Sequence, residues 1–566
     1  MKILGINDSH DAGVTLINNN KIVASINEER LNRIKLCYGF PEKSIKEVLK
    51  ISNLNPKDVD YISIATKYAK FIQKPIPHSD MVLLLIEDRS KIGDLSSYLG
   101  FFFKTKLWNN IQKIILEKKT KERQEKLKKT LRDLGFKCPI KFVEHHLCHA
   151  ASAHFTSGLD KTLIITSDAA GDGVSTSVSL GNKSRITRLY EASSYNSIAK
   201  FYSYVTDLLG FKMGKHEGKT TGLAAYGKPN YINVFKKMII SKNGKLLNIS
   251  NSRHKQSIKK ILKKIGNNFN KEDLACSIQI HLENEFVKFV DHWIKKTNVK
   301  NIVLAGGLFA NVKLNQKIHE LDNVNSIYIH PHMGDGGLSM GAALFLQNRF
   351  TYYNKKLDTI YFGPKYNNNE IKKVLDEHKI KYKLYKNIEQ ITARLLAKGE
   401  VIARFDGAME YGPRALGNRS ILYQTTDPSV NDWLNKKLKR TEFMPFAPVT
   451  LKEDISKNYE NVEGAEYAAK FMTITFNCSK NMKKDCPAVV HLDNTARPQI
   501  ISKNENISYY KILEEYKKLT KSSTIINTSF NIHEEPIVCT PEDAITSFKQ
   551  GHLDYLAIGN FLIKNQ

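Results

Sequence analysis

Two histidines and a carboxylate in the N-terminal half of the chain have the types and spacing of metal ligands. His145 and His149 are four positions apart, so a helix that begins near residue 144 would present both imidazoles on one face. Asp168 follows the apolar run 162–166, which predicts a buried strand with the carboxylate at its C-terminal end. Imidazole and carboxylate donors suit Fe²⁺, Mn²⁺ or Zn²⁺ better than Ca²⁺. The pattern predicts a metal site, although a histidine pair at this spacing can also simply pack in a core.

A later turn offers the fourth ligand. A strand predicted at 326–330 leads into the turn 334–337, of sequence Gly-Asp-Gly-Gly, in which Asp335 has the one functional side chain. Two imidazoles and two carboxylates would leave one or two coordination positions open for substrate oxygens. The predicted ligand set is His145, His149, Asp168 and Asp335.

Glycine-rich turns mark two places where backbone can approach an anion. A strand predicted at 301–304 leads into Gly306 and Gly307 and then into a helix near Asn311, whose first N–H groups would be free to bind a ligand. The stretch 214–227 combines four glycines with two lysines. Glycine turns are often only turns, so these stretches support a binding site without establishing one.

Basic side chains recur in turns of the last third of the chain, among Gly, Asn and Ser. A guanidinium group pairs with phosphate oxygens in a fixed geometry, so such turns suit phosphate groups. Each turn alone is explained by a structural ion pair, but their recurrence in one domain favours an anion site. The residues concerned are Arg414, Lys439, Arg440, Arg497, Asn527 and Ser529.

The elements that would position these residues begin with three short β-rich runs, at 2–6, 13–17 and 21–26, the last two joined by an asparagine turn. His10 lies at the tip of the polar turn between the first two runs, where it either faces a ligand or is a surface histidine. An amphipathic helix is predicted at 42–51. Residues 66–140 are predicted to be an insertion dominated by helices and charge.

The chain is too long for a single core, since 566 residues correspond to two to four ordinary domains. Periodicity is lost at about 348–365. We therefore expect an N-terminal domain at 1–355, which includes the insertion, and a C-terminal domain at 356–566.

Charge and cysteine usage limit the compartment and the partners. The net charge of +29 is partly concentrated at 104–132, where a basic helix with an apolar stripe is predicted. Its basic face is expected to be solvated, the alternatives being contact with anionic lipid, glycan or nucleic acid. The seven cysteines never form a CxxC pair, and no signal peptide or membrane-length apolar run occurs. We expect a cytoplasmic protein without a transmembrane segment.

Several motifs together resemble one enzyme family. They are the runs 145–152 (His-His-Leu-Cys-His-Ala-Ala-Ser), 334–337, 412–420 (Gly-Pro-Arg-Ala-Leu-Gly-Asn-Arg-Ser), 527–531, 535–538 and 540–543. They are similar to those of the O-carbamoyltransferases typified by nodulation protein U and the cephamycin and tobramycin carbamoyltransferases. The resemblance spans nearly the whole chain and is weakest in the insertion at 66–140.

The resemblance implies an α/β protein with two domains. The N-terminal domain would have the actin-like (ASKHA) fold, similar to the tRNA threonylcarbamoyl transferase subunit, and the C-terminal domain would be YrdC-like. Carbamoyl phosphate and ATP, with Mg²⁺, would form carbamoyl adenylate in the C-terminal domain. The N-terminal domain would then transfer the carbamoyl group to a hydroxyl of a sugar or natural-product acceptor.

The resemblance also implies a role for each candidate residue. His145, His149, Asp168 and Asp335 would hold iron or a similar ion, and His10 would be the general base towards the acceptor hydroxyl, as imidazole chemistry permits. Gly306, Gly307 and Asn311 would lie against the adenosine. The phosphates of ATP and carbamoyl phosphate would contact Arg414, Lys439, Arg440, Arg497, Asn527 and Ser529.

This chain departs from the family pattern at three positions. Met444 stands where a basic residue is usual before Pro-Phe-Ala-Pro, Glu534 where glycine is common, and Ala169 where glycine commonly follows the aspartate. These departures concern phosphate binding and leave the predicted metal ligands and His10 unchanged.

Two other functions remain open from the sequence. An actin-like kinase would use the turn of His10 and the Gly306–Gly307 junction to bind ATP, but would leave the histidine pair unexplained. A non-catalytic scaffold could bind RNA or an anionic surface through 104–132, but would have no use for the Arg, Gly and Asn turns. For the enzyme we expect a small-molecule or glycan acceptor, no nucleic acid, and a homodimer.

Overall fold

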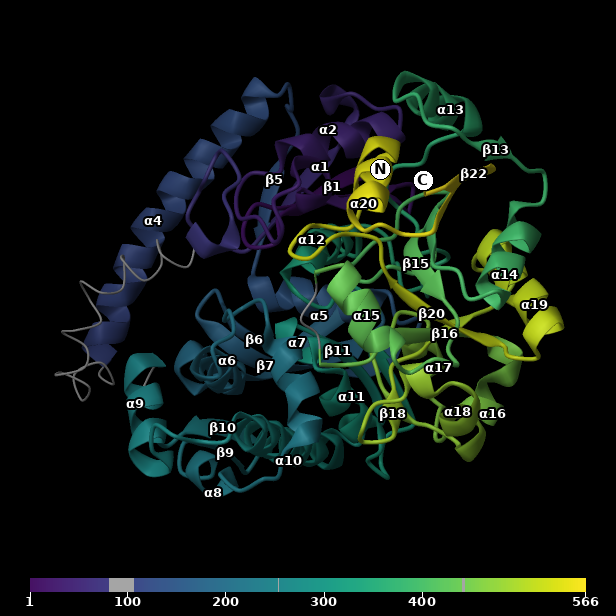
Figure 1. Cartoon of the computed structure of the whole chain (residues 1–566). Coiled ribbons are helices and arrows are strands. Elements are labelled where there is room, and N and C mark those ends of the chain that lie inside the picture. The colour runs from purple at the N-terminus through teal and green to yellow at the C-terminus, as the bar shows by residue number, and fades with distance from the viewer. Residues whose placement is uncertain (81–105, 253, 440–442, 566) are drawn as a thin grey trace.

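The computed structural model describes residues 1–80, 106–252, 254–439 and 443–565, and for 106–119 and 254 the backbone alone (Figure 1). Arg440, one of the predicted phosphate ligands, lies outside these residues. No helix of the described part is long and apolar enough to cross a membrane.

Two five-stranded mixed sheets of the same topology form the N-terminal part. In each sheet three consecutive strands form an antiparallel meander. A fourth strand pairs in parallel with the first strand of the meander, and a fifth pairs in parallel with the fourth. The first sheet, β3-β2-β1-β4-β5, consists of β1 (Lys2–Asn7), β2 (Gly13–Asn18), β3 (Lys21–Asn27), β4 (Tyr61–Ala65) and β5 (Ile140–Val143). The second, β8-β7-β6-β11-β12, consists of β6 (Lys161–Gly171), β7 (Val174–Asn182), β8 (Arg185–Ser193), β11 (Asn301–Ala305) and β12 (Ser326–Ile329).

Two helices, α5 (His145–Phe155) and α12 (Leu338–Gln347), pack against each other between these sheets. α12 also covers β1, β2 and β4, while α5 covers β6 and β11. A Cβ atom at Gly341 of α12 would lie 1.9 Å from the carbonyl oxygen of Cys148 on α5, so only glycine permits this approach. The helices are therefore closer than ordinary side chains would allow.

An eight-stranded mixed sheet forms the C-terminal part, in the order β13-β22-β21-β14-β15-β20-β16-β19. Helices α14 (Ile388–Ala397) and α19 (Ile507–Thr520) pack together and bury Tyr509 and Tyr516 against the sheet. Its strands are β13 (Lys383–Leu384), β14 (Ile402–Phe405), β15 (Arg419–Tyr423), β16 (Ala447–Leu451), β19 (Gln499–Ile501), β20 (Thr524–Ser529), β21 (Tyr555–Ile558) and β22 (Phe561–Lys564).

Two small sheets and the remaining helices complete the fold. The two-stranded sheets are β9 (Ile239–Lys242) with β10 (Lys245–Asn248), and β17 (Phe476–Asn477) with β18 (Thr495–Ala496). The remaining α-helices are α1 (Glu29–Asn32), α2 (Glu42–Ile51), α4 (Lys106–Asp133), α6 (Ile198–Leu208), α7 (Glu217–Leu223), α8 (Ile232–Phe235), α9 (His254–Ile265), α10 (Lys271–Thr297), α11 (Val312–His319), α13 (Asn368–Glu377), α15 (Val430–Lys437), α16 (Ile455–Asn458), α17 (Glu466–Ala469), α18 (Lys480–Asp485) and α20 (Pro541–Gln550).

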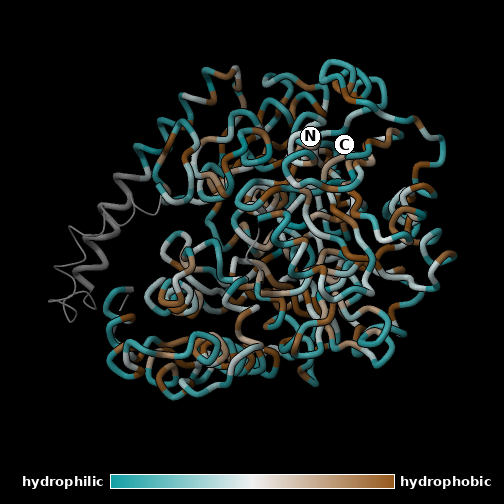
Figure 2. Tube along the Cα trace, viewed as in Figure 1, coloured by the Kyte–Doolittle hydropathy of each residue, from teal (hydrophilic) through white to brown (hydrophobic). Residues whose placement is uncertain are grey.

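The predicted elements are largely confirmed. The three N-terminal strands, the helix at 42–51 and the strands before 168, 306 and 334 all occur, and the mixed α/β class is correct. The stretch 214–227 differs, because much of it is the helix α7 rather than an open turn. Hydrophobic segments gather towards the centre of the molecule and hydrophilic ones along its edge (Figure 2).

The long basic helix α4 runs along the outer edge of the N-terminal part (Figure 1). Its buried Leu127 and Leu131 pack on the first sheet, which confirms the apolar stripe for the residues whose side chains are described. The expectation of a solvated basic face is wrong at one position, since Arg123 is 2% exposed and pairs with the buried Asp8.

The two parts share an interface held by arginines of the short helix α1 and its C-cap. Arg30 donates to the carbonyl oxygen of Gly412 at 3.0 Å, and Arg33 to those of Pro536 and Ile537 at 2.8 Å. Residues 351–365 have no regular structure, yet Ile360 and Phe362 are buried between the parts. The predicted boundary near residue 355 remains a prediction.

Glu534 also joins the two parts. Its carboxylate pairs with the ammonium group of Lys215 and accepts a hydrogen bond from His216 Nε2 at 3.0 Å. Partial burial alone would raise the pKa of Glu534, but the hydrogen bonds from Lys215 and His216 outweigh it and lower this pKa to about 2. The position where the family commonly has glycine is thus occupied by an ion-paired residue with φ of 67°.

We expect Glu534→Gln to destabilise the protein at neutral pH and not in strong acid. A carboxylate whose pKa is lower in the folded state stabilises that state above its ordinary pKa of 4.5, and loses this effect as the pH falls towards about 2. Because a third of the side chain is exposed, the loss at pH 7 should be below about 1 kcal/mol. Urea unfolding from pH 7 to pH 3 measures the difference, with the exposed Glu463→Gln as control. A difference that is independent of pH would contradict the ion-pair interpretation.

Candidate active site

The four predicted metal ligands come together in the folded chain. One ligand atom from each of His145, His149, Asp168 and Asp335 lies within 4.8 Å of all the others. Both histidines are on α5, Asp168 lies in β6 at a bulge between Ser167 and Gly171, and Asp335 is in the 3₁₀ turn before α12. Their convergence follows from the close packing of α5 on α12.

The cluster has the spacing of a metal site rather than of a hydrogen-bonded network. The four distances from a histidine Nε2 atom to an aspartate oxygen are 3.4–3.8 Å, too long for good hydrogen bonds. Two donors at about 2.1 Å from one ion, at a tetrahedral angle, would be about 3.4 Å apart. Both Nε2 atoms are buried and lack a hydrogen-bond partner in the described part of the chain. These donors therefore fit a divalent ion of the iron, manganese or zinc type.

The electrostatics of the two carboxylates suit a bound cation. Burial and the neighbouring Asp168 raise the pKa of Asp335 well above its usual range. Burial also opposes ionisation of Asp168, but the two nearby imidazoles of His145 and His149 outweigh it and hold the pKa of Asp168 well below that range. Burial lowers the pKa of His145, and the charge of Asp335 more than compensates, so this pKa is raised. A divalent ion would let both carboxylates stay charged.

The local structure of α5 directs the two outer histidines at the cluster. Glu144 caps the helix by accepting hydrogen bonds from the N–H groups of His146 and Leu147. His146 points elsewhere, with Nδ1 2.7 Å from Thr166 Oγ1 and Nε2 3.1 Å from the carbonyl oxygen of Val174. The i, i+4 prediction therefore selected the two histidines of α5 that lie in the cluster.

The predicted Gly-Gly junction lies directly beside the cluster. Gly306 has φ of 110°, and a Cβ there would be 2.1 Å from the carbonyl oxygen of Ser167. The N–H of Gly307 points at the Asp168 carboxylate from 3.4 Å. Asn311 is buried and caps α11, accepting from Leu314 N–H at 3.0 Å and donating to Gln279 at 2.8 Å. Contact of these residues with an adenosine remains a prediction, and the side chain of Asn311 has a structural task.

His10 approaches the cluster from the first turn. Its Nδ1 atom is 3.8 Å from Asp335 Oδ2, and its ring meets that of His78 edge to face at 4.6 Å. Burial, reinforced by His78, lowers the pKa of His10 to about 3, so the ring is neutral at pH 7 and is a weaker base than a solvated imidazole. Asn7 Nδ2 holds this turn to the cluster by donating to the carbonyl oxygens of His10 at 2.9 Å and Asp335 at 3.0 Å.

Several of the predicted phosphate ligands converge at one end of the C-terminal sheet. Asn527 Nδ2 donates to the carbonyl oxygen of Ala415, next to Arg414, and to Gln499, two residues after Arg497. Ser529 ends β20 opposite Ser420. Lys439 is exposed and follows Leu438, whose carbonyl oxygen accepts from His533 N–H at 3.2 Å. The structure thus gathers Arg414, Arg497, Asn527 and Ser529 and leaves Lys439 on the adjoining loop.

Glu410 folds the loop that carries Arg414, and the sequence analysis missed it. One carboxylate oxygen of Glu410 accepts from the N–H groups of Leu416, Asn418 and Arg419 at 2.7–3.0 Å. Arg419, fully buried, donates to four backbone carbonyl oxygens and stacks on Phe405. Glu410 lies two positions before the predicted motif 412–420 and Arg419 lies inside it, but residue types alone do not reveal that their partners are backbone groups.

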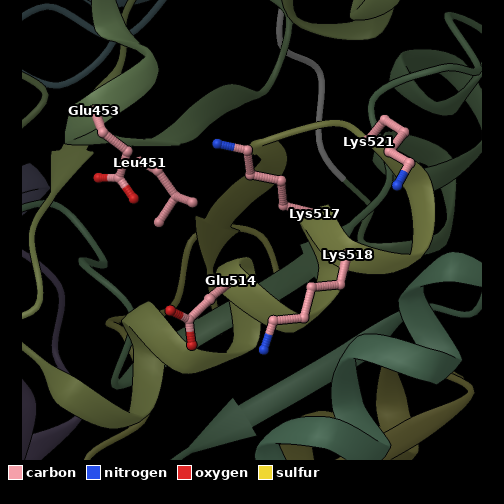
Figure 3. Close-up of a pocket in the computed structure, with 6 residues that line it drawn as sticks. All are labelled: Leu451, Glu453, Glu514, Lys517, Lys518 and Lys521. Carbon is pink, nitrogen blue, oxygen red and sulfur yellow. The ribbon is translucent and has the colours of Figure 1, made fainter.

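Met444 and the surface cavity are separate from these sites. Met444 packs on Gly222 of α7, where a Cβ would come within 2.7 Å of the Met444 side chain. A shallow cavity of about 370 Å³ lies beside α19, and Figure 3 shows its exposed lysines. None of the predicted site residues lines this cavity.

Comparisons with known proteins agree with the motifs. The chain matches the family models described as carbamoyltransferase N-terminus, at residues 2–344, and carbamoyltransferase C-terminus, at residues 393–565. It is 34% identical to an uncharacterized protein, MJ1058, of Methanocaldococcus jannaschii over the full length of both chains. It is 28% identical to nodulation protein NolNO of Sinorhizobium fredii, over 98% of this chain and 79% of that one. A crystal structure of HypF matches with 14% identity and a TM-score of 0.33, over 62% of this chain and 46% of that chain, which is too low to assign a fold.

We expect Mn²⁺ or Zn²⁺ to raise the melting temperature of the wild-type protein and not that of His149→Ala. A ligand that binds only the folded state stabilises it by about 2.7 kcal/mol at one hundred times its dissociation constant. His146→Gln is the matched control, because His146 lies beside the cluster but points away from it. Differential scanning fluorimetry with and without the ion gives the result. An increment that survives His149→Ala would place metal binding elsewhere.

Proposed function

The chain belongs to the carbamoyltransferase family, and from this premise we propose that it transfers a carbamoyl group from carbamoyl adenylate to a hydroxyl of a sugar or natural-product acceptor. The observation that carries the proposal is the cluster of His145, His149, Asp168 and Asp335 with His10 3.8 Å from Asp335. It combines a divalent-metal site with a neutral base, as activation of an alcohol needs.

The duplicated topology supports an actin-like N-terminal domain. Each of its two sheets has three antiparallel strands followed by two parallel ones, in the same order. The glycine junction after β11 and the turn after β1 lie beside the cluster, on the side where such a fold would receive a nucleotide. We further propose that the C-terminal part is YrdC-like and forms the adenylate.

The first half-reaction would take place in the C-terminal part. Carbamoyl phosphate, ATP and one water molecule give carbamoyl adenylate, pyrophosphate and inorganic phosphate, since the carbamoyl oxygen replaces pyrophosphate on the α-phosphorus. Arg414 and Arg497 would hold phosphate oxygens, and Glu410 fixes the loop of Arg414 by accepting from backbone N–H groups. Mg²⁺ would accompany ATP.

The second half-reaction would take place at the cluster. The acceptor oxygen bonds to the carbamoyl carbon, the bond from this carbon to the AMP oxygen breaks, and His10 takes the hydroxyl proton. Fe²⁺, Mn²⁺ or Zn²⁺ held by the four ligands would supply a Lewis acid. The backbone of Gly306 and Gly307, which packs closely on Ser167 and Asp168, would lie against the adenylate.

The alternatives from the sequence find less support. A kinase of this fold would need a carboxylate base in the first turn, but Asp8 is fully buried and paired with Arg123. An RNA scaffold could use the exposed Lys126, Lys129 and Arg132 of α4, but it would leave the cluster of four metal-type ligands unexplained. A homodimer and a cytoplasmic location remain predictions.

Two substitutions separate the half-reactions. Arg414→Ala is expected to lower pyrophosphate release from ATP and carbamoyl phosphate about 100-fold, because it removes a charge that would hold phosphate oxygens. His10→Ala should leave pyrophosphate release without acceptor unchanged and lower transfer to an acceptor about 10²–10⁴-fold.

Mass spectrometry of the metal-loaded protein with both substrates gives the products. The exposed Arg394→Ala in α14 is the control for Arg414→Ala. Formation of ADP, or nucleotide turnover that does not need carbamoyl phosphate, would contradict the proposed function.

A further inference from the structure

We propose that Arg123, on the helical insertion, is a positioning residue that fixes the imidazole of His145 through Thr66. The inference rests on the proposed metal centre and adds to it a residue that lies 22 positions before the first ligand. It makes correct docking of α4 a condition for metal binding.

The side chain of Arg123 extends from α4 to Asp8, in the turn after β1, and to Thr66, which follows β4. One guanidinium nitrogen, Nη2, pairs with the carboxylate of the fully buried Asp8. The other, Nη1, donates to the carbonyl oxygens of Thr66 at 2.7 Å and Lys67 at 3.2 Å. The group also lies over the ring of Phe142, with 5.7 Å to its centroid. A planar fork with two separate nitrogens is needed to hold both partners at once.

Thr66 has a conformation that needs such support. It is a β-branched residue with φ of 68°, which is strained for an L-amino acid with a branched side chain. Arg123 binds its carbonyl oxygen, and Asp172 accepts from the following N–H groups, those of Lys67 at 2.9 Å and Tyr68 at 2.7 Å. Strain that the surroundings hold in place commonly marks a functional position.

The result of this conformation is a hydrogen bond to a predicted metal ligand. Thr66 Oγ1 lies 3.2 Å from Nδ1 of His145, and both side chains are buried. A proton on Nδ1, donated to Thr66, leaves the lone pair of Nε2 facing Asp168 and Asp335. Asp172 links the same turn to α5 by accepting from the N–H of His145 at 2.9 Å. Partners of this kind fix the tautomer and orientation of a metal-binding histidine.

His149, the other histidine of the cluster, lacks the hydrogen bond that His145 makes with Thr66. Its Nδ1 atom is buried without a hydrogen-bond partner among the described residues, so no hydrogen bond at Nδ1 fixes the orientation of its ring. The orientation of His145 is the one that depends on a segment outside the two sheets. Arg123 therefore connects the insertion to one specific ligand.

Titration of the full-length protein with Co²⁺, followed by its visible absorption bands, tests the proposal without relying on activity. Thr66→Ala and Arg123→Ala are expected to weaken Co²⁺ binding about 10–100-fold and to change the spectrum, the range usual for losing such a partner of a metal ligand. Thr66→Ser keeps the hydroxyl and should bind like the wild type. The exposed Arg132→Ala, on the same helix, is the matched control.

Arg123→Lys separates positioning from folding. It keeps a positive charge opposite Asp8 but has one nitrogen where the guanidinium group uses two, so it should fold and still bind Co²⁺ about tenfold more weakly. In the double variant Arg123→Lys/Thr66→Ala the effects should not multiply, because both act on the same hydrogen bond. If Arg123→Ala does not fold, Arg123→Lys and Thr66→Ala give the answer.

Wild-type affinity in both Arg123→Lys and Thr66→Ala would overturn the proposal, and so would effects that multiply in the double variant. The Co²⁺ titration gives a different result if the proposed metal site itself is wrong. In that case the wild-type protein would not bind Co²⁺, or its binding would survive His149→Ala.

Discussion

The close contact between α5 and α12 is the constraint on which the candidate site depends. Gly341 lets the two helices approach until its Cα lies against the backbone of Cys148, one residue before His149. The turn that begins α12 carries Asp335, so the same contact sets the distance between the histidine pair and this carboxylate. Any larger residue at 341 would collide with the backbone of Cys148 and push α5 and α12 apart. The site is therefore a product of helix packing and not of one local motif.

The cost of that arrangement is two carboxylates buried side by side. Burial and mutual repulsion oppose the charge on Asp335, while the histidines support the charge on Asp168. A proton on Asp335, or a bound cation, would relieve the repulsion between them. The arginines of α1 and Glu534 then hold the C-terminal part against the same face. This fits a reaction in which an unstable intermediate must not reach bulk water.

The sequence predicts which four residues cluster but not the residues that support them, for a physical reason. Helical spacing and strand ends are local features, so His145, His149, Asp168 and Asp335 could be selected from their immediate neighbours. The pairing of Asp8 with Arg123 joins residues 115 positions apart, and its arginine looks like any other in a basic helix. Glu410 acts on backbone N–H groups, which leave no trace in residue type. The glycines of 214–227 suggested a turn, but packing on α6 and α10 keeps α7 helical.

Asn7 fixes the position of His10 relative to Asp335. Its single amide nitrogen contacts the carbonyl oxygens of His10, Asp11 and Asp335 at 2.9–3.4 Å. An amide does not titrate, so this link holds its geometry while the neighbouring carboxylates and imidazoles gain or lose protons. An aspartate of the same shape would repel the three carbonyl oxygens. The distance from His10 to Asp335 is thus set by an uncharged group, and protonation can change the charge at the site without changing its shape.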